Sequence, residues 1–308
     1  MSKWTSADIP PQNGRLAIVT GTGGLGFEDG LALSKAGAEV IIAGRSASKG
    51  EEAVSRIKAA VPSAKVQFEA LDLASLTSVA AFVARIKAQR SSLDILINNA
   101  GVMVPPQRQV TADGFELQLG TNYLGHFALT AGLMPLLRKG QDARVVSLSS
   151  VAARNGKLNF DDLQYAKTYL PMQAYGQSKI ACLIFAQELQ RRSVAAKWGV
   201  TSIAAHPGVS RTDLLHNAPG KMSAAGLART YLWFLFQPAW QGALPTLYAA
   251  TAPGAEGGAY YGPDAMAEIR GYPGPAKVPE QALDEQAARR LWLLSEEMTG
   301  VRFEQDQP

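Results

Sequence analysis

A tyrosine and a lysine stand four residues apart in the segment AYGQSK, as Tyr175 and Lys179. In a helix this spacing places both side chains on one face, one turn apart. An ammonium group beside a phenol favours the ionised phenol, which makes tyrosine useful as an acid or base near neutral pH. Tyr165 and Tyr169 have no lysine four residues further on, so they do not compete for this role. The pair therefore predicts proton transfer at Tyr175.

Four glycines follow an apolar, β-branched run in the segment AIVTGTGGLGFEDG, residues 17–30. Gly21, Gly23 and Gly26 match the GxGxxG spacing, in which a loop after a strand lets the backbone approach a pyrophosphate at the next helix N-terminus. The alternative is a tight strand-to-helix turn that binds nothing. Because a strand pattern precedes the glycines and a helix pattern follows them, the segment favours a dinucleotide site.

The residues after the second and third predicted strands bear on which dinucleotide binds. An acidic residue after the second strand would accept from the ribose 2′-hydroxyl of NAD, but this strand ends in AGRS. Arg45 can stack on adenine and pair with a 2′-phosphate, with Ser46 and Lys49 assisting. We expect NADP(H), with NAD(H) and a merely solvated arginine as alternatives. Asp72 either accepts from the adenine amino group or caps the helix that begins near Ser75.

Strand-like and helix-like segments alternate along the chain. Most of the expected strands are apolar throughout, which is typical of buried parallel strands with helices on both faces. We predict an α/β, doubly wound Rossmann sheet of seven mostly parallel strands, which binds ligands beyond the carboxyl ends of its strands. The expected strands cover residues 15–21, 39–45, 65–73, 93–101, 143–150, 200–208 and 258–263.

The composition fits one globular domain with a large core. The chain has 308 residues, of which 47% are hydrophobic and 18% charged, a smaller charged share than usual. A net charge of +4 without a basic block gives no support for nucleic-acid binding. We expect a flexible arm over residues 1–14 and one domain over 15–308, with no metal site, signal peptide, membrane span or anchor. The single cysteine, Cys182, suits a cytoplasmic location and is interpreted as a small core residue.

Several motifs occur together in one order: TG with GLG after the first strand, NNAG, Asn122 in TNYLGHF, Ser150 in SLSS, YGQSK and HPGVSRT. In this combination the chain resembles the short-chain dehydrogenase/reductase family over about residues 15–265. FDDLQ, HPGV, GGAYYGP and the ending ARRLWLLSEEMTG are similar to the branch that holds retinol dehydrogenases, WW-domain oxidoreductase and light-dependent protochlorophyllide reductase. The resemblance implies reversible hydride transfer between a nicotinamide and a carbonyl or alcohol, in a homodimer or homotetramer.

The resemblance also implies roles for individual residues. Tyr175 would be the general acid and base, Ser150 would hydrogen-bond the substrate oxygen, and Lys179 would favour ionisation of Tyr175 and hold the nicotinamide ribose. Asn122 would position a water in the proton relay. Besides Tyr175 and Lys179, the cofactor would be contacted by Gly21, Thr22, Gly23, Gly24, Leu25, Gly26, Arg45, Ser46, Asp72, Leu73, Asn99, Ala100, Gly101, Pro207, Gly208, Val209 and Thr212.

Two segments are predicted to shape the substrate pocket. Ser150 and Tyr175 lie 25 positions apart, more than in many family members, and residues 151–174 between them would form one wall. Residues 209–240 follow the HPG turn and are rich in Leu, Trp, Phe and Met, so we expect a lid over a bulky hydrophobic ketone, aldehyde or alcohol. The same residues would also suit helix packing, a subunit contact or a membrane surface.

Three other functions share this framework. They are a photoenzyme acting on a tetrapyrrole, an NADP-sensing protein without catalysis, and an epimerase or dehydratase with a retained cofactor. A sensing protein would not need to keep Ser150, Tyr175 and Lys179 together, so their joint presence favours the oxidoreductase. His206, beside Pro207, is interpreted as a packed residue and not as a proton donor.

The glycine loop departs from the family that the chain resembles. The family pattern is TGxxxGxG, whereas residues 20–26 read TGTGGLG, one residue shorter. Thr22 is the only polar side chain between Gly21 and Gly26. We therefore expect dinucleotide binding that relies more on backbone N–H groups and on Arg45 than on side chains of the loop.

Overall fold

The computed structural model describes residues 3–210 and 237–303 of the chain. In this part of the chain the strands are β1 (Leu16–Thr20), β2 (Glu39–Gly44), β3 (Val66–Ala70), β4 (Ile95–Asn98), β5 (Arg144–Leu148), β6 (Thr201–Ala205), β7 (Tyr260–Ala265) and β8 (Arg270–Pro275). The longer helices are α1 (Gly24–Lys35), α2 (Ala47–Ala60), α3 (Leu76–Gln89), α5 (Gly125–Leu137), α6 (Pro171–Ala195), α10 (Leu244–Thr251) and α11 (Glu285–Thr299). Short helical turns are η1 (Ser6–Asp8), α4 (Leu117–Leu119), η2 (Gly120–Leu124), η3 (Val151–Asn155), α9 (Ala239–Gly242) and η5 (Glu280–Leu283).

The described strands form one sheet in the order β3-β2-β1-β4-β5-β6-β7-β8. β1 to β7 run parallel, and β8 runs antiparallel to β7, with Tyr261 opposite Pro275. The predicted doubly wound class is confirmed, but the expected number of seven strands was one too low. β8 contains two prolines, which a sequence pattern assigns to a loop. At the edge of a sheet a proline is tolerated, because its missing N–H breaks no ladder.

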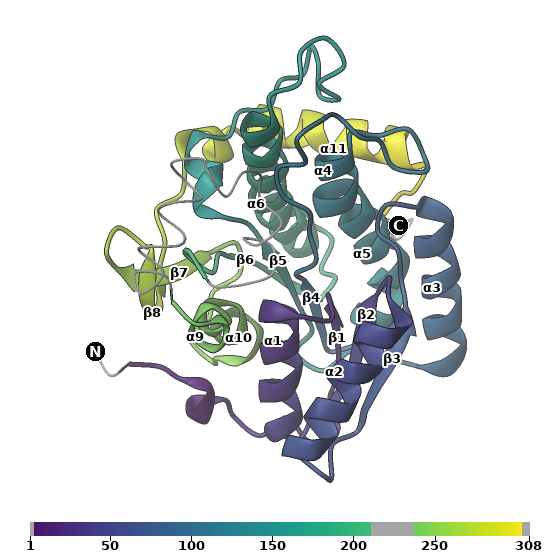
Figure 1. Ribbon diagram of the computed structural model, residues 1–308, viewed down its shortest axis with the longest axis vertical. Helices are drawn as coiled ribbons and strands as arrows, with labels where there is room; N and C mark the ends of the chain where they lie inside the picture. Colours follow the sequence, from purple (N-terminus) through teal and green to yellow (C-terminus); the bar gives the residue numbers. More distant parts are fainter. Residues whose placement is uncertain (1–2, 211–236, 304–308) are drawn as a thin grey trace.

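Helices cover both faces of the sheet (Figure 1). On one face α3, α5, α6 and α11 enclose a core that includes Phe127 and Trp292. On the other face α1, α2 and α10 enclose a second core that includes Leu33. Neighbouring residues of β1 alternate between the two, with Ile18 in the first core and Val19 in the second. With both faces of the sheet covered, the loops at its carboxyl edge are left to form a ligand site.

Parts of the N-terminal segment contact the domain, and the flexibility expected over residues 1–14 stays a prediction. Trp4 packs edge-on against Tyr248 of α10, with 5.4 Å between the ring centroids. Gln12 is buried, with 2% of its surface exposed. Sequence reasoning missed these contacts because the segment is polar and lacks a periodic apolar pattern.

One carboxyl group in α1 is buried without a partner. Asp29 is fully buried, and neither of its side-chain oxygens has a hydrogen-bond partner among the described residues. Burial, and to a smaller extent the nearby Glu28, raises the pKa of the Asp29 carboxyl well above its usual range. The folded protein therefore keeps this proton at pH values where the unfolded chain has released it.

We expect Asp29→Asn to stabilise the protein most at high pH. Because the pKa of Asp29 is higher in the folded protein, the unfolding free energy of wild type falls as the pH rises from about 4 to that folded-state pKa. The fall is about 1.4 kcal/mol per pH unit. Asparagine does not titrate, so the gain in unfolding free energy should be larger at pH 8 than at pH 5, reaching about 1–3 kcal/mol. Urea unfolding at both pH values measures it, with Glu285→Gln on the exposed side of α11 as the control. An equal gain at both pH values would contradict this account.

Candidate active site

The predicted catalytic pair lies in the first turns of α6. This helix begins with Pro171, whose fixed φ suits the first helical position, and Tyr175 and Lys179 follow on one face. Both side chains are buried, and Lys179 Nζ lies 5.9 Å from the centroid of the Tyr175 ring. Nζ also donates a hydrogen bond of 3.1 Å to the carbonyl oxygen of Leu148 at the end of β5. The pair is thus fixed at the carboxyl edge of the sheet.

Ser150 follows β5 in a loop that α6 and β7 hold in place. Oγ of the neighbouring Ser149 donates to the Lys179 carbonyl oxygen at 2.7 Å, and the Tyr260 hydroxyl donates to the Ser150 carbonyl oxygen at 3.3 Å. Ser150 Oγ accepts from the Ala152 N–H at 3.2 Å and so caps η3. Because a hydroxyl that accepts one N–H can still donate its own proton, Ser150 can bond a substrate oxygen. The structure therefore brings Ser150 next to the turn of α6 that carries Lys179.

Asn122 joins the loop after β4 to α6. It lies in η2, a π-helical turn of a kind that is frequent at functional sites. Its side chain accepts from Val102 N–H at 2.7 Å and donates to Val102 O at 3.0 Å and to Ser178 Oγ at 2.9 Å. A Cβ on Gly101 would lie 3.0 Å from Asn122 Oδ1 and 3.6 Å from Lys179 Nζ. These contacts give Asn122 a place beside the lysine, and its role in holding a water stays a prediction.

A histidine that sequence reasoning left without a role links two parts of the site. Burial lowers the pKa of His126 to about 4, so its ring is neutral near pH 7. Its Nδ1 lies 2.9 Å from the Asn122 carbonyl oxygen and must donate there, which leaves Nε2 to accept from the Thr20 hydroxyl at 2.9 Å. That hydroxyl also accepts from the N–H groups of Asn99 and Ala100. The only sequence signal was the four-residue spacing between Asn122 and His126 in TNYLGHF.

The glycine loop is tightly folded and its helix end is open to an anion. Gly21 and Gly24 have φ values of 101° and 51°, which favour glycine. A Cβ on Gly26 would collide with the Gly21 carbonyl oxygen and lie 2.7 Å from Asn99 Nδ2. The N-cap of α1 is Gly23, which offers no side-chain acceptor to the first-turn N–H groups. Those groups can bind a phosphate, so the loop fits a dinucleotide despite its shorter length.

Arg45 lies beside this loop, after the last residue of β2. Arg45 is exposed. The residue before it, Gly44, packs against Thr22 of the glycine loop, and a Cβ added at Gly44 would lie 2.7 Å from the Thr22 methyl carbon. Ser46 is the N-cap of α2, and its Oγ accepts from the Lys49 N–H at 3.4 Å. A phosphate near Arg45 would thus also face the N-terminus of α2, which favours negative charge.

Asp72 forms a local turn in the loop after β3. Its Oδ1 accepts from the Ala74 N–H at 3.0 Å, whereas the N-cap of α3 is Ser75. The interpretation of Asp72 as the helix cap was therefore wrong, and a contact with adenine stays a prediction. Leu73 is buried, and its carbonyl oxygen leaves room only for glycine at Gly125. Leu73 is placed to hold this loop against α5.

The HPG turn follows β6. Gly208 has a φ of 60°, and an added Cβ would collide with the Ile269 carbonyl oxygen, which also accepts from the Val209 N–H at 2.8 Å. His206 is buried against the Tyr260 ring at 5.0 Å, so its interpretation as a packed residue is confirmed. Thr212 and residues 211–236 of the expected lid lie outside the described residues.

Comparisons with known proteins identify the family of this chain. A family model described as short chain dehydrogenase matches residues 15–222. The chain belongs to the short-chain dehydrogenase family. It is 41% identical over 300 residues to polyprenol dehydrogenase of Homo sapiens, covering 95% of this chain and 87% of the relative. It is 38% identical over 307 residues to retinol dehydrogenase 12 of Mus musculus, covering 97% and 90%.

A solved structure has the same fold. The crystal structure of an uncharacterized protein from Mycobacterium Paratuberculosis superposes with a TM-score of 0.80 at 37% identity, covering 98% of this chain and all of that one. The short-chain dehydrogenase described here therefore belongs to the retinol dehydrogenase-like branch. Such enzymes use NAD(P)(H) and act on the CH–OH group of a small molecule.

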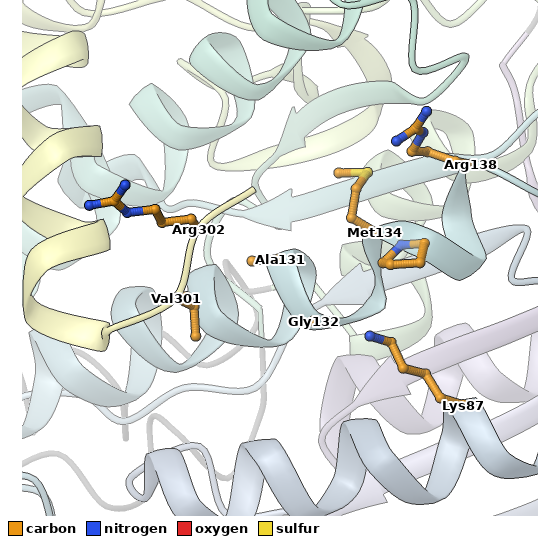
Figure 2. Close-up of a pocket in the computed structure, with 8 residues that line it drawn as sticks. Lys87, Ala131, Gly132, Met134, Arg138, Val301 and Arg302 are labelled. Atoms are coloured by element: carbon orange, nitrogen blue, oxygen red, sulfur yellow. The ribbon is translucent and has the colours of Figure 1, made fainter. Parts of the chain in front are cut away.

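A hollow of this dehydrogenase is lined by residues other than the predicted site residues (Figure 2). It has a volume of about 270 Å³ and lies between α3, α5 and the residues after α11. Lys87, Arg138 and Arg302 are at its rim, and in Figure 2 their charged ends do not converge. No helix within residues 3–210 or 237–303 is long and apolar enough to cross a membrane. The same ranges contain no group of three or more His, Cys, Asp or Glu that could hold a metal ion.

Proposed function

We propose that this chain is an NADP(H)-dependent oxidoreductase for bulky hydrophobic alcohols and the corresponding aldehydes or ketones. The observation that carries the proposal is the meeting of Tyr175, Lys179 and the Ser150 loop at the sheet edge that also carries the glycine loop. A phenol, an ammonium and a hydroxyl there can manage the proton and the oxygen of a carbonyl substrate.

The residues of the chain would divide the work of the reduction. The nicotinamide, when bound, supplies the hydride. The Ser150 hydroxyl donates a hydrogen bond to the substrate oxygen and holds it in place, and the Tyr175 hydroxyl gives its proton to that oxygen. Lys179 stabilises the phenolate that Tyr175 then becomes. In alcohol oxidation the same phenolate takes the proton back.

The proposed substrate class has two supports. Two relatives are named for polyprenol and retinol. Leu170 and Met172, at the start of α6 and just before Tyr175, are large apolar side chains with 45% and 59% of their surface exposed. A long apolar alcohol passing this surface would bring its oxygen toward Tyr175.

A coupled assay tests the function. Purified protein is mixed with NADP⁺ or NADPH, and in parallel with NAD⁺ or NADH, and with a panel of isoprenoid, retinoid and aromatic alcohols and carbonyls. We expect nicotinamide turnover with bulky hydrophobic members. Turnover that needs light would indicate a photoenzyme, and product without net nicotinamide turnover an epimerase or dehydratase. Dinucleotide binding without any product would indicate a sensing protein, and each of these results would replace the proposal.

The cofactor preference rests on Arg45. We expect Arg45→Ala to weaken NADP⁺ binding by about 10- to 100-fold, the effect of losing one or two charge-assisted hydrogen bonds, and to weaken NAD⁺ binding much less, because there only the stacking on adenine is lost. Lys58→Ala, on the exposed end of α2, is the matched control for loss of a surface cation. Dissociation constants for both dinucleotides, measured by calorimetry, decide the matter. Equal weakening for both would show that Arg45 does not read the 2′-phosphate.

A further inference from the structure

A carboxylate on the β7–β8 loop contacts two elements of the site at once. Glu268 Oε2 lies 2.9 Å from His206 Nε2 and 2.7 Å from a guanidinium nitrogen of Arg154. His206 directly precedes the turn at Pro207, and Arg154 lies in η3, which Ser150 caps. One side chain thus joins the loop after β5 to the loop after β6.

The protonation states fit a fixed link. Burial lowers the pKa of His206 to about 4, so near pH 7 the ring is neutral and has one N–H. Its Nδ1 accepts from the Gly208 N–H at 3.2 Å, so the proton is on Nε2 and is donated to Glu268. Partial burial of Glu268 opposes ionisation, but the Lys277 N–H and Arg154 outweigh it and lower the pKa of this carboxyl.

The backbone that carries Glu268 is strained. Met266, Ala267 and Glu268 have φ values of 50°, 53° and 65°, and three successive residues other than glycine in this region are unusual. Such strain persists only where surrounding contacts hold it, and it is concentrated at functional sites. Arg154 also donates to the Ala267 carbonyl oxygen at 2.9 Å. Figure 1 shows β7 and β8, which this loop connects, side by side at one edge of the sheet.

We propose that Glu268 is a positioning residue for hydride transfer. By binding His206 and Arg154 together, it fixes the Pro207 turn, which would contact the nicotinamide, relative to the loop that carries Ser150. This inference rests on the proposed function. It extends the site to the β7–β8 loop, to which the sequence motifs assigned no role.

We expect loss of the Glu268 carboxylate to lower kcat and to leave the affinity for NADPH nearly unchanged. Glu268→Ala should lower kcat by about 10- to 100-fold, because misplacement of the reacting groups by about 1 Å costs on that order. The dissociation constant of NADPH should change by less than about threefold, since the glycine loop and Arg45 are untouched. Glu268→Gln, which keeps the shape and an acceptor, should recover part of the loss.

The test uses wild type, Glu268→Ala, Glu268→Gln, Arg154→Ala and the Glu268→Ala/Arg154→Ala double variant. Glu285→Gln, which breaks an exposed ion pair with Arg289, is the matched control. The readouts are kcat, KM and the isotope effect with NADPH deuterated at the transferred position. The value of kcat is calculated from the concentration of NADPH-binding sites. A positioning role predicts a larger isotope effect in Glu268→Ala and a double variant no worse than the more impaired single variant.

The outcomes separate this inference from the proposed function. If wild type shows no nicotinamide turnover with any substrate, the proposed function fails, and the inference falls with it. Suppose that wild type turns over and that Glu268→Ala only lowers the number of NADPH-binding sites, with the isotope effect and the kcat per site unchanged. Glu268 is then merely structural, and the inference alone is overturned.

Discussion

Replacing Tyr175 with phenylalanine is expected to lower kcat by about 10²- to 10⁴-fold, the usual contribution of one positioned acid or base. The variant keeps the ring that lies 5.9 Å from Lys179 Nζ and removes only the hydroxyl. NADPH binding should therefore stay within about threefold of wild type, because one neutral hydroxyl contributes little to it. Stopped-flow or steady-state assays measure the rate, and NADPH fluorescence titration measures binding.

A matched control comes from a second buried tyrosine. Tyr260 donates to the Ser150 carbonyl oxygen and is given no proton transfer in the proposed mechanism. Tyr260→Phe should cost about 1 kcal/mol of stability for the lost hydrogen bond and much less rate than Tyr175→Phe. Near-full turnover in Tyr175→Phe would contradict the role of Tyr175 as general acid and base, whatever the effect of Tyr260→Phe.

The second large effect is loss of stability in acid. His126 and His206 are buried and neutral, and burial lowers the pKa of each from 6.5 to about 4. Between those pH values the unfolded chain binds more protons than the folded protein, so stability falls as the pH falls. Each histidine accounts for about 3 kcal/mol over this window, while Asp29 acts in the opposite direction because its folded pKa is raised.

Comparison with a variant isolates one of the two histidines. His126→Gln removes the titrating ring and leaves the other groups in place. The difference in unfolding free energy between wild type and His126→Gln should move by about 3 kcal/mol in favour of the variant between pH 6.5 and 4. Urea unfolding at several pH values gives both curves. Parallel curves for the two proteins would show that His126 is not held neutral by the fold.

Much of the fold could be predicted because the local pattern and the tertiary structure agree. α3 spans Leu76–Gln89 with Ser75 as its N-cap, and a helix beginning near Ser75 was expected from the sequence. The parallel strands were recognisable as apolar runs buried on both sides. Since parallel strands end at one edge, the meeting of Ser150, Tyr175 and Lys179 with the glycine loop followed from strand positions alone.

What could not be predicted depends on contacts between distant residues. Thr20 and His126 are 106 positions apart, and His206 and Glu268 are 62 apart, so no local pattern signals either pair. β8 was missed because prolines and glycines argue against a strand except at an edge, and edge position is a property of the assembled sheet. The environment of Asp29 could not be predicted either. Its position along α1 does not show that both of its carboxyl oxygens lack hydrogen-bond partners among the described residues.

The position of the β7–β8 loop in the chain has a consequence for how this enzyme can diverge. The family model's match ends at residue 222, so the loop around Glu268 lies beyond it, while Ser150, Tyr175 and Lys179 lie within it. The groups proposed to move the proton and the loop proposed to brace the Pro207 turn are thus encoded in separate stretches of sequence. If Glu268 positions the site as proposed, mutations in the second stretch would change turnover while the catalytic motif stays the same.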